Sequence, residues 1–367
     1  MNREIPRCST CLMPRTTKSI SFDAYGKCSL CKEHIGKTNI NTQRLSLDGA
    51  IESIKERGKG KEYDCLVGVS GGKDSIYLLG LLVRNHKLRC LAAYYRTPFT
   101  PQVIDDNVKK ITSILDVPLI EMNLSQEYHR TVTAEFVKEW KKTKEQIIVN
   151  LACSPCKLLH RELYSIAREH KIPTIVHGDN KYEHAPIAAG QFRSNTMDRY
   201  SLSTNLLRLF IIAKRGFNVL LRHPIVFNHL GLIFKSSMLY LNPYTAYLRL
   251  RYPKIVVFNY FDVACWVESE CDKSLNDLGW QLPKGLFTNK KADCTFAHLK
   301  NLMTSQSAGA DYFDCLFSNM VRYGLLERSQ ALNRLMLEGA SPLEHIDETY
   351  RILGLPLDYL EFKQKGP

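Results

Sequence analysis

The chain reads DCLVGV over residues 64–69, SGGKDS over residues 70–75 and then a mainly apolar run over residues 76–83. The first stretch is typical of a buried strand and the third of a helix, so SGGKDS is a strand-to-helix turn. Its two glycines let backbone N–H groups approach an anion, and the helix adds its partial positive charge. Since α/β sheets bind ligands at the carboxyl ends of strands, we expect a phosphate here rather than an empty turn.

The composition is that of a soluble globular protein. The chain has 367 residues, of which 44% are hydrophobic and 24% charged, enough for an α/β core and smaller modules. No apolar run approaches the ~20 residues of a membrane-spanning helix, and the start MNREIPRCST lacks a signal-peptide core. We therefore expect a cytoplasmic protein. Six of the twelve cysteines occur in Cys-x-x-Cys pairs, which favours metal or catalytic sulfur over disulfides.

The net charge of +13 is concentrated in residues 190–254, which hold ten Lys and Arg against one acid, Asp198. Such a field attracts RNA, an anionic membrane face, an acidic partner or the diphosphate of a sugar nucleotide. A solvated surface is the alternative. The apolar stretches of this segment predict helices that face either the core or lipid.

Strands and helices alternate from residue 63 onward. The predicted strands cover residues 64–69, 89–95, 119–124, 174–177 and 254–260. The predicted helices between them cover residues 75–85, 102–115, 125–144 and 155–170. This alternation predicts a doubly wound parallel sheet with right-handed crossovers. Further helices are expected at residues 206–213, 225–234, 267–278, 299–303, 312–326, 329–337 and 342–353.

These patterns divide the chain into four parts. Residues 1–38 form a cysteine-bearing module, and residues 39–60 a polar linker with a short helix near 45–54. Residues 61–264 form the α/β domain, which carries the basic insert 190–254. Residues 265–367 form a helical C-terminal region.

Four cysteines near the amino terminus have the spacing of a zinc site. Cys8-x-x-Cys11 and Cys28-x-x-Cys31 are separated by sixteen residues. Four thiolates close a tetrahedron, so the site is structural, and Gly26 suits the turn of a knuckle. A module of this size buries too little core to fold unaided, so the metal supplies folding energy. Iron could also occupy such a site, with zinc the default.

A third pair, Cys153 and Cys156, precedes the helix that leads to the fourth strand. A helix start lowers the pKa of a thiol, which would suit this pair to metal binding, redox exchange or sulfur delivery. Cys294 is a candidate third ligand, and an iron–sulfur cluster on three cysteines leaves one iron open. The alternative is that these cysteines are small buried core residues.

Several residues that follow the fourth strand in the sequence are further candidates for the site. Gly178 permits close approach of a ribose or base, and Asp179 can hold Mg²⁺ or a polar substrate group. Glu183 and His184 can supply a general base. Arg322 can grip an anionic substrate or form a surface salt bridge.

The spacing of SGGKDS resembles the pyrophosphate loop of the ATP pyrophosphatase (PP-loop) superfamily. The order Cys-x-x-Cys, Cys-x-x-Cys, SGGKDS, Cys-x-x-Cys and GDN resembles the N-acetyl sugar amidotransferase family of bacterial surface-polysaccharide clusters. The resemblance is strongest in residues 5–80 and 150–183, and residues 190–254 do not take part in it.

The resemblance implies an enzyme that splits ATP into AMP and pyrophosphate. The AMP would activate the acetamido oxygen of a nucleotide-linked sugar, and ammonia would replace that oxygen to give an acetamidino group in lipopolysaccharide (O-antigen) synthesis. A separate glutaminase subunit would supply the ammonia, alongside a cyclase-like partner. ATP, Mg²⁺ and Zn²⁺ are the implied cofactors.

The resemblance also implies roles within the loop. Four residues would cradle the pyrophosphate: Ser70, Gly71, Gly72 and Ser75. Lys73 would offset developing negative charge, and Asp74 would position the loop or Mg²⁺. Gly178 would border the nucleotide, and Asp179 completes the expected catalytic set with Lys73 and Asp74.

Two other classes remain open. A tRNA thiolase of the same superfamily would use the same adenylation with sulfur instead of nitrogen, and the basic segment 190–254 favours RNA. The chain lacks the second Cys-x-x-Cys set near the carboxyl end that one thiolase group carries. A non-catalytic zinc-ribbon adaptor is disfavoured by the intact loop.

Overall fold

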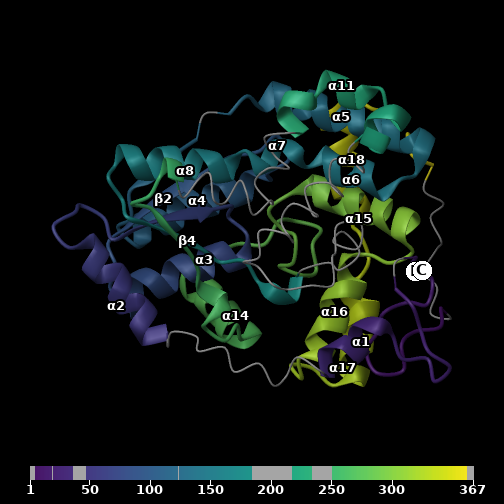
Figure 1. Ribbon diagram of the computed structural model, residues 1–367, viewed down its shortest axis with the longest axis horizontal. Coiled ribbons are helices and arrows are strands. Elements are labelled where there is room, and N and C mark those ends of the chain that lie inside the picture. Colours follow the sequence, from purple (N-terminus) through teal and green to yellow (C-terminus); the bar gives the residue numbers. More distant parts are fainter. Residues whose placement is uncertain are drawn as a thin grey trace.

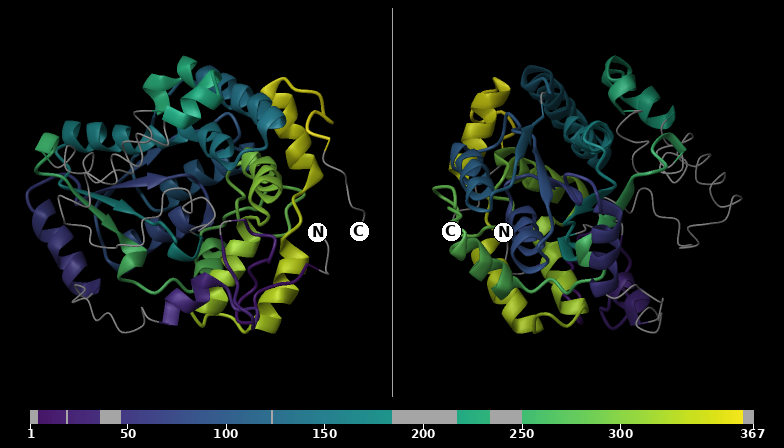
Figure 2. Two further views of the ribbon diagram at one scale, coloured as in Figure 1. Left: turned by 45° about the vertical axis from the view of Figure 1, so that its right-hand side comes forward. Right: turned by 90° about the vertical axis from the view of Figure 1, so that its left-hand side faces the viewer.

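The computed structural model describes residues 5–18, 20–35, 47–122, 124–183, 217–233 and 250–361. A parallel sheet lies on one side of the molecule and a helical region on the other (Figure 1). The N-terminal module packs against helices of that region, α16 and α17, in all views (Figures 1 and 2). Among the described residues, no helix combines the length and apolarity needed to cross a membrane.

The sheet has five parallel strands in the order β3-β2-β1-β4-β5, which confirms the predicted fold class. The strands are β1 Cys65–Val69, β2 Cys90–Tyr94, β3 Leu119–Glu121, β4 Thr174–His177 and β5 Val256–Asn259. Strands β2 and β3 lie on one side of β1, and β4 and β5 lie on the other side. The crevice between the carboxyl ends of β1 and β4 is therefore the switch point where such sheets bind ligands.

The strand β1 is buried on both faces because helices cover each side. Cys65, Val67 and Val69 point into a core that includes residues of α2, α3 and α4. Leu66 points the other way, into a core with Leu163 of α8. This burial explains why the strand reads as a continuous apolar run rather than an alternating one.

The helices largely follow the predicted ranges. They are α1 Ser29–Ile35, α2 Leu47–Gly58, α3 Lys73–Gly80, α4 Gln102–Ile114, α5 Gln126–Thr143, α6 Gln146–Ala152, α7 Ser154–Lys157, α8 Leu159–Glu169, α11 Ile225–Asn228, α14 Glu268–Asp277, α15 Thr295–Ala308, α16 Tyr312–Arg322, α17 Arg328–Glu338 and α18 Leu343–Leu353. Single turns are η2 Lys181–Glu183 and η3 Tyr260–Asp262, and η1 Leu81–Asn85 is a π-helical extension of α3.

Two helices differ from the prediction. The single helix expected over 155–170 is divided into α7 and α8 at Leu158. Helix α6 was not expected, and it forms because its apolar residues enter the second core. The short helix expected near 45–54 is α2, whose Ile51 and Ile54 are buried against the sheet domain. The helix expected at 206–213 lies outside the described residues.

A second core joins α5 and α6 to the C-terminal helices α15 and α18. Its largest buried side chain is Trp140, whose Nε1 donates a hydrogen bond to Ser307 Oγ at 2.7 Å. Helices that the sequence analysis grouped with the sheet therefore pack with the C-terminal region. This packing brings residues near 290 to the carboxyl edge of the sheet.

Gly71 offers a test of how tightly the turn after β1 is packed. Its φ is +85°, and a Cβ there would lie 2.5 Å from Ile104 Cγ2. Gly60 has φ +71° with nothing within 4 Å, so it is a matched control for backbone strain alone. We expect Gly71→Ala to lower the free energy of unfolding by about 2 to 4 kcal/mol and Gly60→Ala by about 1 kcal/mol. Urea unfolding measures both, and equal losses would show that packing around Gly71 is loose.

Candidate active site

The loop Ser70–Ser75, called the SGGKDS loop below, joins β1 to α3 at the switch point of the sheet. Its serines fold it back on itself. Ser70 Oγ accepts from the Gly72 N–H at 3.2 Å, and Ser75 Oγ donates to the Gly72 carbonyl at 2.9 Å. Gly72 is the N-cap of α3 and supplies no side-chain cap, so the first N–H groups of the helix face the loop. This is the geometry of an anion site.

Lys73 is the first residue of α3, and it is buried, with 4% of its surface exposed. Its Nζ lies 2.6 Å from Asp74 Oδ2 and 2.7 Å from Glu183 Oε1. The same Nζ is 5.0 Å from the ring centroid of Trp266, whose Nε1 donates to Asp74 Oδ1 at 2.7 Å. The lysine is thus held by two carboxylates and an indole face.

Glu183 lies between two lysines. It belongs to η2, just after β4, and its second oxygen accepts from Lys291 Nζ at 2.8 Å. The Nζ of Lys291 also lies 4.3 Å from the ring centroid of Tyr312. The sequence named Glu183 only as a possible base; the structure makes it the bridge between Lys73 and a lysine from the C-terminal region.

The protonation states of this cluster follow from burial and charge. Burial opposes ionisation of Glu183, but Lys291 and Lys73 hold its pKa well below the usual range. Burial likewise opposes the charge of Lys73, yet Glu183 and Asp74 raise its pKa. At Asp74 the effect of burial, together with the charge of Glu183, outweighs the attraction of Lys73 and raises the pKa of the carboxyl group to about 6. The cluster therefore keeps both lysines available as cations beside the SGGKDS loop.

Asp293 also faces the loop, although the sequence analysis did not single it out. Its Oδ2 lies 2.9 Å from the position that a Cβ on Gly72 would occupy. Trp280 donates from Nε1 to the Gly71 carbonyl at 3.0 Å. Neither residue belongs to a recognisable spacing, because the loops that carry them reach the site only through folding.

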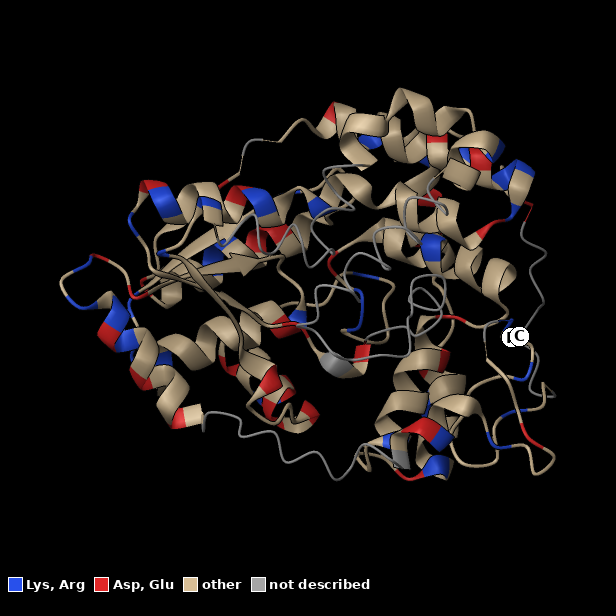
Figure 3. Cartoon of the chain, in the orientation of Figure 1, with Lys and Arg blue, Asp and Glu red and all other residues tan. Residues whose placement is uncertain are grey.

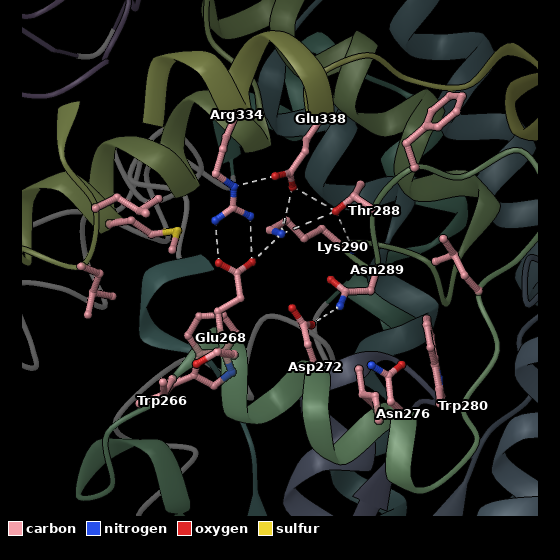
Figure 4. A pocket seen from close by; sticks show the side chains of 18 residues that line it. Trp266, Glu268, Asp272, Asn276, Trp280, Thr288, Asn289, Lys290, Arg334 and Glu338 are labelled. Atoms are coloured by element: carbon pink, nitrogen blue, oxygen red, sulfur yellow. Dashed lines mark hydrogen bonds and ion pairs between the residues drawn. The ribbon is translucent and has the colours of Figure 1, made fainter. Parts of the chain in front are cut away.

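A cavity of about 780 Å³ is lined by Trp266 and Trp280, which contact the SGGKDS loop, and by residues 288–290 (Figure 4). Lys290 enters this cavity, where its Nζ lies 2.8 Å from Glu268 and 2.9 Å from Glu338. Arg334 pairs with the same two carboxylates. These four charges compensate one another, and they fix the segment from which Lys291 and Asp293 point to the SGGKDS loop.

Gly178 and Asp179 lie where the sequence placed them, after β4. A Cβ on Gly178 would come within 3.0 Å of Leu78 Cδ2, so only glycine lets the chain pass this close to α3. Asp179 is exposed, and its backbone exchanges hydrogen bonds with the Asn259 side chain at 2.9 and 3.2 Å. Burial lowers the pKa of the neighbouring His177 to about 4, so its imidazole is neutral at pH 7. His184 lies outside the described residues.

Cys153, Cys156 and Cys294 come together at the carboxyl edge of the sheet, close enough for each charge to act on the others. The expectation of a lowered thiol pKa is wrong for Cys156, because burial raises it. The pKa of Cys294 is raised to about 12, again chiefly by burial. Cys156 Sγ lies 3.5 Å from His129 Nε2. Burial therefore favours the neutral thiol at Cys156 and Cys294, and α7 is too short to act as a strong dipole.

The four N-terminal cysteines are preassembled for a metal ion. They are buried, and their Sγ atoms all lie within 4.8 Å of one another. Among the described residues, no other group of three or more His, Cys, Asp or Glu side chains brings its ligand atoms this close together. The Cys28 N–H donates to Cys8 Sγ at 3.2 Å and the Met13 N–H to Cys11 Sγ at 3.5 Å. These are bonds that stabilise thiolates, so the donor set fits zinc.

Arg322, for which the sequence suggested a substrate anion or a surface salt bridge, contacts the cysteine module. Its Nη1 donates to Cys11 Sγ at 3.2 Å, and its Nη2 hydrogen-bonds Asn319 on the same helix. Asn319 Nδ2 in turn donates to the Tyr182 carbonyl at 2.8 Å. Helix α16 therefore connects the cysteine module to the residue that precedes Glu183.

Comparison with known proteins gives distant similarity. No family model matches the chain. An uncharacterized protein of Methanocaldococcus jannaschii is 27% identical over 119 residues, which cover 32% of this chain and 42% of that protein. The chain thus aligns with less than half the length of this relative.

Comparison with solved structures gives three similarities of low score. An NMN synthetase from Francisella tularensis has a TM-score of 0.37 at 12% identity, covering 84% of this chain and 92% of its own. An NH3-dependent NAD synthetase from Campylobacter jejuni scores 0.28 at 15% identity, covering 60% and 96%. A tRNA thiolase from Methanococcus maripaludis, solved with its 4Fe-4S cluster, scores 0.32 at 13% identity, covering 99% and 92%. None is similar enough to assign an activity to this chain.

Asp74 gives a pH-dependent prediction. Its pKa rises from the ordinary 3.8 to about 6 on folding, so its contribution to stability is full below pH 4 and is lost as pH rises through 6. We expect Asp74→Asn to gain on the order of 2 kcal/mol of stability relative to wild type between about pH 4 and pH 7. Urea unfolding across pH measures this. Asp277→Asn, at an exposed position, should show no such trend, and a flat difference for Asp74→Asn would contradict the assigned burial.

The cysteine module gives a prediction about metal. We expect about one metal ion per chain, and we expect Cys28→Ser to lose it and lower the thermal midpoint by roughly 10 °C. Elemental analysis and thermal unfolding measure the two effects. Cys265→Ser, at an exposed thiol, is the control. Equal metal content in both variants would show that these four thiols do not bind it.

Proposed function

We propose that the chain is an ATP-dependent N-acetyl sugar amidotransferase. ATP would bind at the SGGKDS loop and be split into AMP and pyrophosphate, with the AMP passed to the acetamido oxygen of a nucleotide-linked sugar. The observation that carries this proposal is the pair of cations, buried Lys73 and partly exposed Lys291, that Glu183 holds beside a helix start at the sheet's switch point. A triphosphate is the ligand class that such a site suits.

The reaction follows from a leaving-group problem. An amide oxygen is too basic to leave when ammonia attacks the carbonyl carbon. Transfer of AMP to that oxygen releases pyrophosphate and makes the oxygen part of a phosphate ester. Ammonia then adds to the carbon, AMP departs with the oxygen, and loss of a proton leaves the acetamidino group.

The residues of the loop would act mainly through charge and position. The N–H groups of Gly71, Gly72 and the start of α3 would bind the β- and γ-phosphates, with Ser70 and Ser75 donating hydroxyls. Lys73 and Lys291 would offset the charge that builds up as pyrophosphate leaves. Because both lysines are already placed by Glu183, little reorganisation is needed when ATP binds.

Carboxylates at the loop fit a magnesium ion. Asp74 belongs to the loop and Asp293 lies against Gly72, and oxygen ligands of this kind suit Mg²⁺. The ion would screen the phosphates from these carboxylates and from each other. Asp179, exposed at the same edge of the sheet, would contact the ribose or the sugar, and Gly178 would leave room for it.

The partners are part of the proposal. Free ammonia is scarce at neutral pH, so a glutaminase subunit would supply it, with a cyclase-like protein in the same pathway. We also propose that the enzyme works in the cytoplasm on O-antigen precursors, where ATP and nucleotide sugars are made. Zn²⁺ would occupy the Cys8, Cys11, Cys28 and Cys31 site.

One observation favours a second candidate, a tRNA thiolase. Cys153, Cys156 and Cys294 converge beside the SGGKDS loop, and Cys294 lies next to Asp293, which faces Gly72. A single metal ion needs its sulfur ligands within about 4 Å of one another, which this trio does not provide, whereas a cluster of several irons spaces them more widely. The three thiols would hold such an iron–sulfur cluster, and sulfur would then take the place of ammonia.

The proposed activity is tested by incubating purified protein with ATP, ammonium and a panel of nucleotide-linked acetamido sugars. We expect AMP and pyrophosphate in equal amounts, and mass spectrometry of the sugar should show the acetamidino product. Lys73→Met should reduce turnover about 100-fold to 1,000-fold, and thermal unfolding would show that it still folds. Lys61→Met, at an exposed position, should leave turnover unchanged.

Two results would count against the amidotransferase. AMP formation that requires tRNA, with iron bound to the chain and lost in Cys294→Ser, would favour the thiolase. No AMP with any acetamido sugar or RNA would exclude both.

A further inference from the structure

The segment 217–233 covers the outer side of α5 and is apolar on both of its faces. Residues 217–222 and 230–233 are helical, and α11 lies between them at the edge of the molecule (Figure 1). On the inner side, Val226 and Leu232 are buried in the second core. Large apolar side chains on its second face would be stabilised by a cover as well.

The second face is exposed in the folded chain. Phe217 and Leu221 are one helical turn apart and are 61% and 64% exposed. Phe227 and Leu230, three residues apart, are 53% and 42% exposed. Scattered exposed apolar residues are common, but four large ones within fourteen residues indicate a contact surface.

The two histidines of the segment point inward, to glutamates of α5 and of the turn after it, whereas Asn218, Arg222 and Asn228 are exposed. His223 lies 3.1 Å from Glu139 and 3.3 Å from Glu145, and it is buried. His229 lies 2.5 Å from Glu135. The segment is therefore fixed to the protein by its histidines, and its outward face is left without an acid. Figure 3 shows α11 free of charged residues.

The composition of the surrounding sequence indicates which kind of surface would cover the exposed face of residues 217–233. No Asp or Glu occurs between Asp198 and Asp262, and this stretch contains nine Lys and Arg. A basic stretch that presents Phe and Leu is the composition of interfacial segments that bind anionic lipid.

Other occupants fit less well. The flanking Lys and Arg would suit RNA as well as lipid. The exposed face of residues 217–233, however, holds one cation, Arg222, and consists mainly of large apolar side chains, which an acyl boundary needs and a phosphate backbone does not. A second copy of the chain would bring two acid-free basic stretches together, which repel.

We propose that residues 217–233 bind the surface of an anionic lipid bilayer. Phe217, Leu221, Phe227 and Leu230 enter the boundary between headgroups and acyl chains, while the neighbouring Lys and Arg attract the headgroups. The contact is peripheral and requires no spanning helix. It is independent of the reaction at the SGGKDS loop.

The test uses the full chain and vesicle flotation. Wild-type protein should float with vesicles of phosphatidylcholine mixed with phosphatidylglycerol, weakly with phosphatidylcholine alone, and less at raised salt. Leu221→Ser with Phe227→Ser should weaken binding by at least about tenfold. The matched control is Leu337→Ser with Leu357→Ser, two exposed leucines of the C-terminal region, which should bind as wild type does.

Three results would overturn the proposal. The first is that the wild-type protein binds neither kind of vesicle. The second is that the Leu221/Phe227 variant binds vesicles as strongly as the wild type. The third is that this variant loses RNA binding or self-association but keeps its vesicle binding. AMP formation is measured without vesicles, so failure of the lipid contact and failure of the proposed reaction are seen separately.

Discussion

The ion cluster of Lys73, Glu183 and Lys291 is the constraint on which the rest of the site depends. Lys73 is buried and Glu183 nearly so, and removing one of these two would leave the other uncompensated, whereas Lys291 keeps part of its side chain in water. Its members come from α3, from the turn after β4 and from the C-terminal region. Those three parts of the chain must therefore dock correctly before the cations can stand beside the SGGKDS loop.

The side chains of the short segment from Lys290 to Cys294 contact four different parts of the structure. Lys290 is fixed among Glu268, Arg334 and Glu338, and Lys291 reaches Glu183. Asp293 faces Gly72, and Cys294 joins the cysteine trio. Because the anchor is a compensated ion network, the segment is held rigidly without a hydrophobic core of its own, and its neighbours are placed with it.

Helix α16 gives the cysteine module a part in this arrangement. The module is distant from the loop along the chain, yet Arg322 contacts Cys11, and Asn319 holds the carbonyl of Tyr182, next to Glu183. A metal in the module would fix one end of α16 and, through it, the turn that carries Glu183. The cysteine module and the turn that carries Glu183 are thus two ends of one packed unit.

The sequence by itself determined the elements whose signals are local: the strand-to-helix turn with its glycines, the alternation that builds the parallel sheet, and the Cys-x-x-Cys spacing. These depend on neighbours within a few residues, so they can be read directly. Only the tertiary structure decided that Lys291, Asp293 and Trp266 meet the SGGKDS loop, and that Arg322 faces thiols. Their positions follow from how helices far apart in the chain pack, which no spacing encodes. Burial, another property of packing, also raised the pKa of Cys156 where its helix start predicted the opposite.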